Sequence, residues 1–224
     1  MEFKQCRANK ILAYLKKEYP KPKTELNYTN QFQCLVAVML SAQCTDALVN
    51  RVTAELFKKY VTVDDFANAE LGDVRELIKS VSFFNNKAKN IIASAKLIQE
   101  KFDGKLPKSV SEMIELPGVA YKTANVVLGE VYDIWEGIAT DTHVRRFALR
   151  FELVTPKQGF GVRTDLTKIS KELEELFPKK DWKYVNNGLV LYGRYICPAR
   201  KHDCAEHPLT KLIPSANNIW TRSK

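Results

Sequence analysis

The sequence lacks any apolar run long enough to cross a lipid bilayer. Its longest such run, Cys34 to Leu40, falls far short of the roughly 20 residues that a transmembrane helix needs. A secretory signal is missing as well, because Met1 to Tyr19 is charged and amphipathic instead of carrying an apolar core. We therefore expect no membrane association and an intracellular location, in the cytoplasm or nucleoid.

Cysteine is scarce, and its five residues cannot all pair with one another because their number is odd. Without a signal, this argues for a reducing compartment and against a disulfide framework. Stretches rich in Pro, Gly or Ser are absent too, so no flexible linker divides the chain. Three of the cysteines are expected to be small core residues of helical segments: Cys6, Cys34 and Cys44.

What the chain does contain is an excess of basic residues, 35 against 26 acidic ones, which gives a formal net charge of +9. The basic residues are spread along the sequence, which favours a folded basic face over a disordered arm. A polyanion such as nucleic acid is the expected partner of such a face.

Apolar residues recur at helical spacing almost throughout, and no alternating strand pattern is present, so we predict an all-α fold. Phe32 to Leu40 predicts a buried helix. Asp46 is a candidate N-cap, and Ser109 with Glu112 has capping-box spacing. The tail from Pro208 is predicted to be irregular. Other predicted helices include Leu71 to Val81, Lys87 to Phe102, Tyr121 to Tyr132, Leu166 to Phe177 and Tyr184 to Tyr195.

A Pro-Gly turn between two predicted helices is the most informative motif. Lys122 lies in the first turn of the second helix, after Gly118, Val119, Ala120 and Tyr121. Turn amides and a helix N-terminus bind phosphate. The same positive helix end favours the free amine of a lysine, and a free amine can form a Schiff base with a sugar. An ordinary helix connector with a solvated lysine has the same local pattern.

Several segments together closely resemble the endonuclease III family of DNA glycosylases. They occur in the family's order from about Thr24 to Cys204, which is most of the chain. The matching segments are Leu40-Ser41-Ala42-Gln43, Thr45-Asp46, Asn85 with Lys87-Ala88, Leu116 to Val119, Lys122 to Val127, Asp141-Thr142-His143, and Tyr192 to Tyr195 before Cys197.

The resemblance implies an all-α, two-lobed helix-hairpin-helix glycosylase fold with a DNA groove between the lobes. One lobe would be a central helical bundle, residues 24–135, and the other would combine residues 1–23 with 136–224. Double-stranded DNA is the implied partner, and a monomer is the implied acting form.

The resemblance also assigns the chemistry, with Lys122 as nucleophile and Asp141 as catalytic carboxylate. The amine would attack the anomeric carbon as the damaged base leaves, and the resulting Schiff base would lead to β-elimination 3′ to the lesion. A carboxylate stabilises the positive charge that base departure builds on the sugar. The implied substrates are oxidised pyrimidines in duplex DNA. From the sequence alone, an N-cap before Thr142 is the better-supported role of Asp141.

Extruding a nucleotide leaves a gap in the duplex. The family's gap-filling glutamine falls on Gln43, where a solvated polar residue at a helix end is the alternative. Its wedge residue, usually leucine, falls on Phe83, where core packing is the alternative role. An aromatic side chain can also part base steps. His143 is either a structural histidine or a phosphate contact. A DNA-facing or a solvated helix face is expected for three arginines: Arg145, Arg146 and Arg150.

The hairpin departs from the family's pattern at Ala120, which replaces a second glycine, and at Tyr121, which replaces a basic residue. Because alanine resists positive φ, we expect an altered turn or a weaker phosphate grip at Ala120. Tyr121 removes one positive charge from the face expected to meet DNA.

The family's iron–sulfur motif, C-x6-C-x2-C-x5-C, is incomplete, since its positions are Cys197, Cys204, His207 and Ile213. A [4Fe–4S] cluster normally takes four thiolates. We therefore expect no metal or other cofactor, with vestigial cluster positions at Cys197, Cys204 and His207. Zinc bound by these three and His202 has suitable ligand types, but the spacing matches no common zinc motif.

Two rival functions stay open. A mismatch-type glycosylase that removes adenine or thymine would commonly lack the nucleophilic lysine, which is present here. A non-catalytic helix-hairpin-helix DNA-binding module would have no need of both Lys122 and Asp141.

Overall fold

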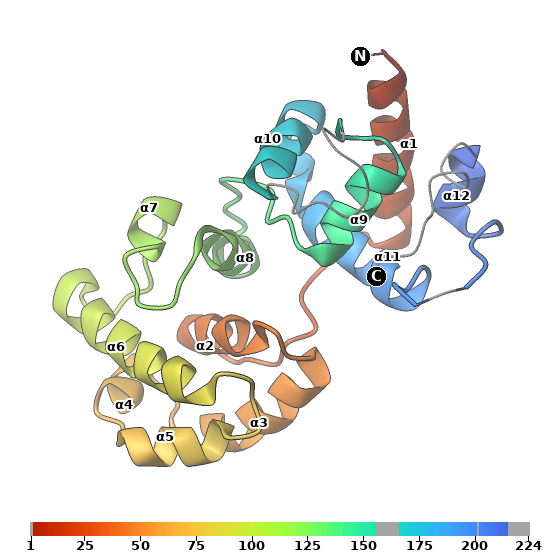
Figure 1. Ribbon diagram of the computed structural model, residues 1–224. Coiled ribbons are helices and arrows are strands. Elements are labelled where there is room, and N and C mark those ends of the chain that lie inside the picture. The colour runs from red at the N-terminus through yellow and green to blue at the C-terminus, as the bar shows by residue number, and fades with distance from the viewer. Residues whose placement is uncertain (1, 156–165, 201, 215–224) are drawn as a thin grey trace. The chain divides into compact units, whose positions relative to one another are not determined.

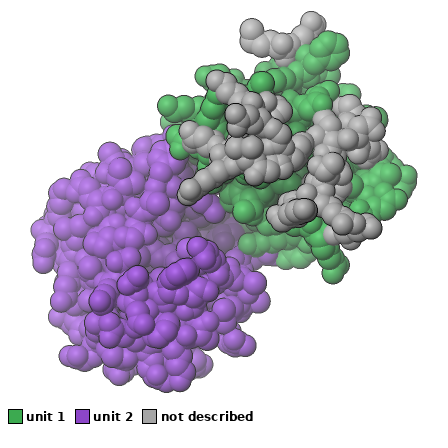
Figure 2. Space-filling view, viewed as in Figure 1, with its two compact units in different colours: residues 1–23, 137–224 green, residues 24–136 purple. Residues whose placement is uncertain are grey.

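The regular elements of the computed structural model are all helices (Figure 1). It describes residues 2–155, 166–200 and 202–214, and no strand occurs within these ranges, which confirms the all-α prediction. No helix in the described part of the chain has the length and apolarity needed to span a membrane. The chain forms two compact units, which Figure 2 distinguishes by colour: unit 1 is Met1–Lys23 with Gly137–Lys224, and unit 2 is Thr24–Glu136.

Unit 2 is built around α2 (Gln31–Ser41), which is buried from Phe32 to Leu40 as the sequence predicts. A helix that is apolar on every side must be covered on every side. Helices α3, α6 and α8 pack against it. The remaining elements of this unit are α3 (Asp46–Lys59), α4 (Val63–Ala67), α5 (Leu71–Ile78), α6 (Phe84–Phe102), α7 (Val110–Met113) and α8 (Tyr121–Tyr132).

The helix starts in unit 2 follow ordinary capping chemistry. Ser109 caps α7, as predicted. Thr45 caps α3 in place of the predicted Asp46, because the Thr45 side chain accepts a hydrogen bond from a backbone N–H of the first turn. Helix α4 was not predicted, although Thr62 and Asp65 form a reciprocal capping box at its start.

Unit 1 joins the N-terminal helix to the C-terminal half of the chain. Helix α1 packs against α10, η2 and α12, and α9 packs against α10 and α11. Phe147 of α9 meets Tyr192 of α11 edge to face, with ring centroids 5.2 Å apart. The elements are α1 (Glu2–Glu18), α9 (Thr142–Arg150), α10 (Leu166–Leu176), the 3-10 turn η1 (Lys179–Asp181), the π-helical turn η2 (Tyr184–Gly188), α11 (Leu189–Tyr195) and α12 (Pro208–Leu212).

Helix α12 corrects the prediction of an irregular tail from Pro208. Pro208 occupies the first helical position, where its fixed φ suits a helix start and its missing N–H is not needed. Leu209 and Thr210 are buried, whereas Leu212 is 40% exposed.

A close packing contact in unit 2 leads to a stability prediction. Gly129 of α8 lies against the buried ring of Trp135, and a Cβ at Gly129 would overlap that ring. We expect Gly129→Ala to lower the free energy of unfolding by about 1–3 kcal/mol, as measured by urea denaturation. Gly72→Ala on α5 is the matched control, because a Cβ there meets nothing within 4 Å. Equal destabilisation by both changes would contradict the packing argument.

Candidate functional site

The candidate hairpin consists of α7, the turn that follows it, and α8. Gly118 has a φ of +81°, in the left-handed region that favours glycine. A Cβ at Gly118 would also lie 2.6 Å from Asn90 Nδ2 of α6, so both conformation and space require glycine. Ser94 Oγ of α6 donates a hydrogen bond to the Pro117 carbonyl at 2.9 Å. The turn is thus held in place against α6.

Ala120 has φ −94° and ψ 167°, an extended conformation that any residue adopts. The positive φ on which the expected change of the turn rested is therefore not found at Ala120, and a weaker phosphate grip stays a prediction. Ala120 is the N-cap of α8 and offers no side-chain acceptor to the first N–H groups of the helix. Val119 is buried, and its N–H donates to the Leu116 carbonyl at 3.0 Å. The start of α8 consequently presents backbone donors without a side-chain cap.

Lys122 lies in the first turn of α8 and is exposed to solvent. Tyr121 beside it is 44% exposed. The opposite side of α8 is buried through Ala124, Val127 and Leu128. Core packing of that side therefore turns the Lys122 amine toward solvent, where a ligand can reach it.

Asp141 is the N-cap of α9 in unit 1. Its Oδ1 accepts hydrogen bonds from the N–H groups of His143 and Val144, both at 2.8 Å. The capping role that the sequence favoured is thus formed. Both bonds end on Oδ1, so the second carboxylate oxygen is not needed for the cap. Asp141 can therefore hold a fixed geometry and still offer an oxygen to a reaction.

Two exposed turns of unit 2 carry the residues expected to enter the duplex. Gln43 has φ 57° and Phe83 has φ 58°, so both hold a left-handed backbone. Ser82 connects the turns, since its Oγ donates to the Gln43 carbonyl at 3.3 Å and its N–H donates to Cys44 Sγ at 3.4 Å. Phe83 is 63% exposed, so core packing does not account for it. The structure brings Gln43 and Phe83 to neighbouring turns.

Lys87 anchors the Gln43 turn from α6. Its Nζ donates to the carbonyls of Leu40 and Ala42, at 2.9 and 2.7 Å, and lies 3.8 Å from Cys44 Sγ. A cation at these last carbonyls of α2 is favoured by the helix dipole. Burial lowers the pKa of Lys87 from its ordinary value, and the Cys44 sulfur opposes that shift. The sequence includes Lys87 in the family resemblance, but no local signal indicates that it caps α2.

His143 packs against α11. Its Nδ1 lies 3.3 Å from Arg146 Nη2, and a Cβ at Gly193 would overlap the imidazole. Arg146 also donates to the Cys197 carbonyl at 2.8 Å. These contacts favour the structural role of His143 among the two that were open, and a phosphate contact stays a prediction.

Two of the three α9 arginines are not on a surface at all. Arg146 is 9% exposed and Arg150 is fully buried, so both expected roles, DNA-facing or solvated, are wrong for them. Arg150 donates to Cys197 Sγ at 2.9 Å and to Cys204 Sγ at 2.8 Å. It also donates to Thr210 Oγ1 at 3.0 Å, which links α9 to α12.

The family's cluster positions gather in unit 1, but they do not fit a [4Fe–4S] cluster. Ile213, at the fourth position, is 3% exposed and has no donor atom, and two thiols do not replace four. Cys197, His202 and His207 nevertheless place ligand atoms within 4.8 Å of one another and could hold a metal ion. The expectation of no metal is therefore not confirmed.

The other cysteines only partly follow their expected role. Cys34 is buried in α2, whereas Cys6 is exposed on α1 and Cys44 lies half-buried in the turn before α3. The expectation of a core position is therefore wrong for Cys6, whereas Cys44 packs against the core while partly buried.

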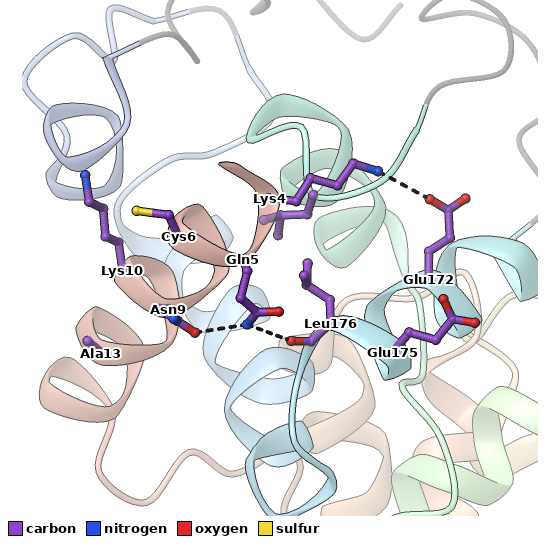
Figure 3. A pocket seen from close by; sticks show the side chains of 10 residues that line it. Lys4, Gln5, Cys6, Asn9, Lys10, Ala13, Glu172, Glu175 and Leu176 are labelled. Atoms are coloured by element: carbon purple, nitrogen blue, oxygen red, sulfur yellow. Dashed lines mark hydrogen bonds and ion pairs between the residues drawn. The ribbon is translucent and has the colours of Figure 1, made fainter. Parts of the chain in front are cut away.

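A cavity of about 960 Å³ lies in unit 1 between α1 and α10 (Figure 3). Lys4 and Glu172 form an ion pair at its edge, with Nζ and Oε2 3.8 Å apart. Gln5 Nε2 donates to Asn9 Oδ1 and to the Leu176 carbonyl. Among the residues described for its lining, none belongs to the predicted site, so the cavity is not the candidate site.

The names of similar proteins refer to DNA repair by endonuclease III. Residues 36–179 match the HhH-GPD superfamily of base excision DNA repair proteins. The chain is 43% identical to endonuclease III of Synechocystis sp. (strain ATCC 27184 / PCC 6803 / Kazusa) over 216 residues, which cover 96% of this chain and 95% of the relative. It is 41% identical to endonuclease III of Bacillus subtilis (strain 168), over 87% of this chain and 85% of the relative.

Solved structures agree with the sequence matches. A trapped endonuclease III–DNA covalent intermediate superposes with a TM-score of 0.82 at 35% identity, over 92% of this chain and 94% of that one. A thermostable thymine-DNA glycosylase, 18% identical, has a TM-score of 0.76 over 97% of this chain and 98% of that one, and it supports the fold alone. On these grounds the chain belongs to the HhH-GPD superfamily of base excision DNA repair proteins and, within it, to the endonuclease III family.

Proposed function

We propose that this protein is a bifunctional DNA glycosylase and AP lyase that removes oxidised pyrimidines from duplex DNA. The observation that carries the proposal is Lys122, an exposed lysine in the first turn of α8, the helix that follows the left-handed turn at Gly118. The identity of 43% to an endonuclease III over 96% of the chain supports the same activity. Neither a mismatch-type glycosylase nor a non-catalytic module is favoured, because both would leave Lys122 without a role.

In the proposed reaction, the Lys122 amine attacks C1′ of the damaged nucleotide, and the bond from C1′ to the base breaks. The base leaves with the electron pair of that bond and takes up a proton. The bond from C1′ to the ring oxygen O4′ then breaks, O4′ takes up the proton that the nitrogen gives up, and the nitrogen is left in a Schiff base with C1′. This Schiff base makes a proton on C2′ more acidic. Loss of that proton expels the 3′ phosphate by β-elimination, and hydrolysis of the imine frees Lys122.

Asp141 is the proposed electrostatic partner of base release. Departure of the base builds positive charge on the sugar, and a fixed carboxylate stabilises that charge more than it stabilises the neutral substrate. The two hydrogen bonds that Oδ1 accepts fix the Asp141 side chain before substrate arrives. This fixed geometry supports a role that is both structural and catalytic.

The proposed DNA contacts come from three turns of unit 2. The turn of Gly118, Val119 and Ala120 is proposed to hold a phosphate through the N–H groups of Gly118, Ala120 and the start of α8, since the Val119 N–H donates to Leu116. Gln43 is proposed to fill the gap left by the extruded nucleotide, and Phe83 to part the neighbouring base step. The exposure of both side chains on neighbouring turns supports this assignment. We propose duplex DNA as the partner and a monomer as the acting form.

Lys122→Gln removes the amine while keeping a polar side chain on an exposed position. We expect complete loss of borohydride trapping and of strand cutting on abasic duplex DNA, with duplex binding retained. Lys105→Gln is the matched control, an exposed lysine of unit 2 outside the hairpin, and it should be trapped like the parent. Parent-level trapping of Lys122→Gln would overturn the proposal.

Asp141→Asn removes the negative charge and keeps the helix cap, because asparagine caps helices about as well as aspartate. We expect base release to slow by about 10²–10⁴-fold, while the melting temperature stays that of the parent. Asp141→Ala should lose the cap as well, which should lower the free energy of unfolding by about 1 kcal/mol. A normal rate of base release in Asp141→Asn, measured in single-turnover reactions on a lesion duplex, would contradict the catalytic role.

Lys87→Met keeps the length of the side chain and removes the donor that anchors the Gln43 turn. Because the carbonyls of Leu40 and Ala42 lose this partner, we expect a loss of about 1–3 kcal/mol in unfolding free energy. Amide hydrogen exchange over residues 42–45 should become faster, and duplex affinity should fall. Lys89→Met, an exposed position on the same helix, is the control. Equal effects of both variants would show that the anchoring argument is wrong.

A further inference from the structure

Unit 1 contains metal-ligand side chains that the proposed reaction does not use. They lie on the connection from α11 to α12 (Figure 1). Cys197 follows α11 and is fully buried, and His207 is the N-cap residue of α12. His202 lies between them in the sequence, and the ligand atoms of all three lie within 4.8 Å of one another. The connection therefore folds back so that its two ends meet.

We propose that Cys197, His202 and His207 bind a zinc ion in place of the family's iron–sulfur cluster, with Cys204 as the fourth ligand. Two thiolates and two imidazoles form a donor set that suits tetrahedral Zn²⁺. His202 lies between the first two cluster positions, where the family's motif has no ligand. The proposed zinc site thus lies where the family's cluster motif lies but uses a different set of ligands.

The two histidines are oriented as metal ligands usually are. His202 Nδ1 lies 2.7 Å from the Arg200 carbonyl, and donation of its proton to this oxygen leaves Nε2 as the nitrogen with a lone pair. Such a hydrogen bond from the second ring nitrogen is the ordinary support of a metal-bound histidine. His207 Nδ1 is buried and has no hydrogen-bond partner among the described residues. Bound zinc would satisfy this nitrogen, which otherwise makes burial unfavourable.

Arg150 contacts both sulfurs and links Cys204 to the group of Cys197, His202 and His207. Its Nη1 and Nη2 donate to Cys197 Sγ and Cys204 Sγ at 2.9 and 2.8 Å, so one guanidinium holds both atoms. Hydrogen bonds from a second shell to metal ligands fix the orientation of those ligands. The bond from Nη2 to Thr210 Oγ1 extends the same support into α12. Arg150 thus acts through the sulfurs and is a positioning residue of the site.

The proposed zinc ion has a structural role. It would cross-link the end of α11 to the start of α12, and binding of an ion to such a connection adds directly to folding stability. The site involves neither Lys122 nor Asp141. Metal content and borohydride trapping can therefore be measured separately on the same preparation, and failure of one proposal does not affect the other.

The test is elemental analysis of the untagged full chain, produced in medium supplied with both iron and zinc. We expect one zinc per chain and no iron at cluster stoichiometry. His202→Ala and His207→Ala should each lose most of the zinc. Cys6→Ser should keep it, because Cys6 is exposed on α1 of the same unit. Arg150→Lys should weaken zinc binding by about 10–100-fold in competition with a chelator.

A second measurement covers variants that fail to fold. Replacing zinc by Co²⁺ in the parent should give the intense visible bands of tetrahedral cobalt and a thiolate charge-transfer band. A chelator should lower the melting temperature of the parent and leave that of folded His207→Ala unchanged. Three results would each overturn the proposal. The first is a metal-free parent protein whose melting temperature does not change with the chelator. The others are iron at cluster stoichiometry and full zinc content in both histidine variants.

Discussion

Helix α2 carries apolar side chains on all sides, and these leave water only when other helices surround it. Helices α3, α6 and α8 do so, and their packing fixes where their exposed ends lie. At the end of α2, the buried ammonium of Lys87 binds the last carbonyls and thereby sets the turn that exposes Gln43. At the start of α8, the same core packing leaves Lys122 on the solvent side. The residues proposed to meet DNA from unit 2 therefore depend on the burial of one helix.

The sequence predicted those features that local chemistry determines. The helix Tyr121–Tyr132 has the predicted bounds, because Ala120 is extended before it and Asp133, with φ 53°, ends it in the left-handed conformation. The Asp141 cap is equally local, since its partners are two and three residues away. Lys122 is different. Only the resemblance of many ordered segments distinguished it from other exposed lysines, and its exposure on α8 agrees with that assignment.

Two of the errors concern residues whose surroundings come from distant parts of the chain. Arg150 looks like a surface residue in a charged helix, yet the sulfurs that bury it come from a segment after α11. The closeness of His202 to Cys197 could not be predicted either, because the spacing of these residues in the sequence matches no common zinc motif. The expectation for Ala120 assumed a positive φ at that position. In this turn the left-handed conformation falls on Gly118 alone, so position 120 does not require glycine.

The left-handed backbones at Gln43 and Phe83 have an evolutionary consequence. A residue with a side chain loses about 1–2 kcal/mol in this conformation compared with the right-handed one, and glycine or asparagine adopts it more easily. Selection for heat resistance alone would favour such replacements at both turns. A laboratory lineage evolved in that way would keep its fold and its nucleophile. It would lose the side chains proposed to open the duplex, so its thermal tolerance would rise while its repair capacity fell.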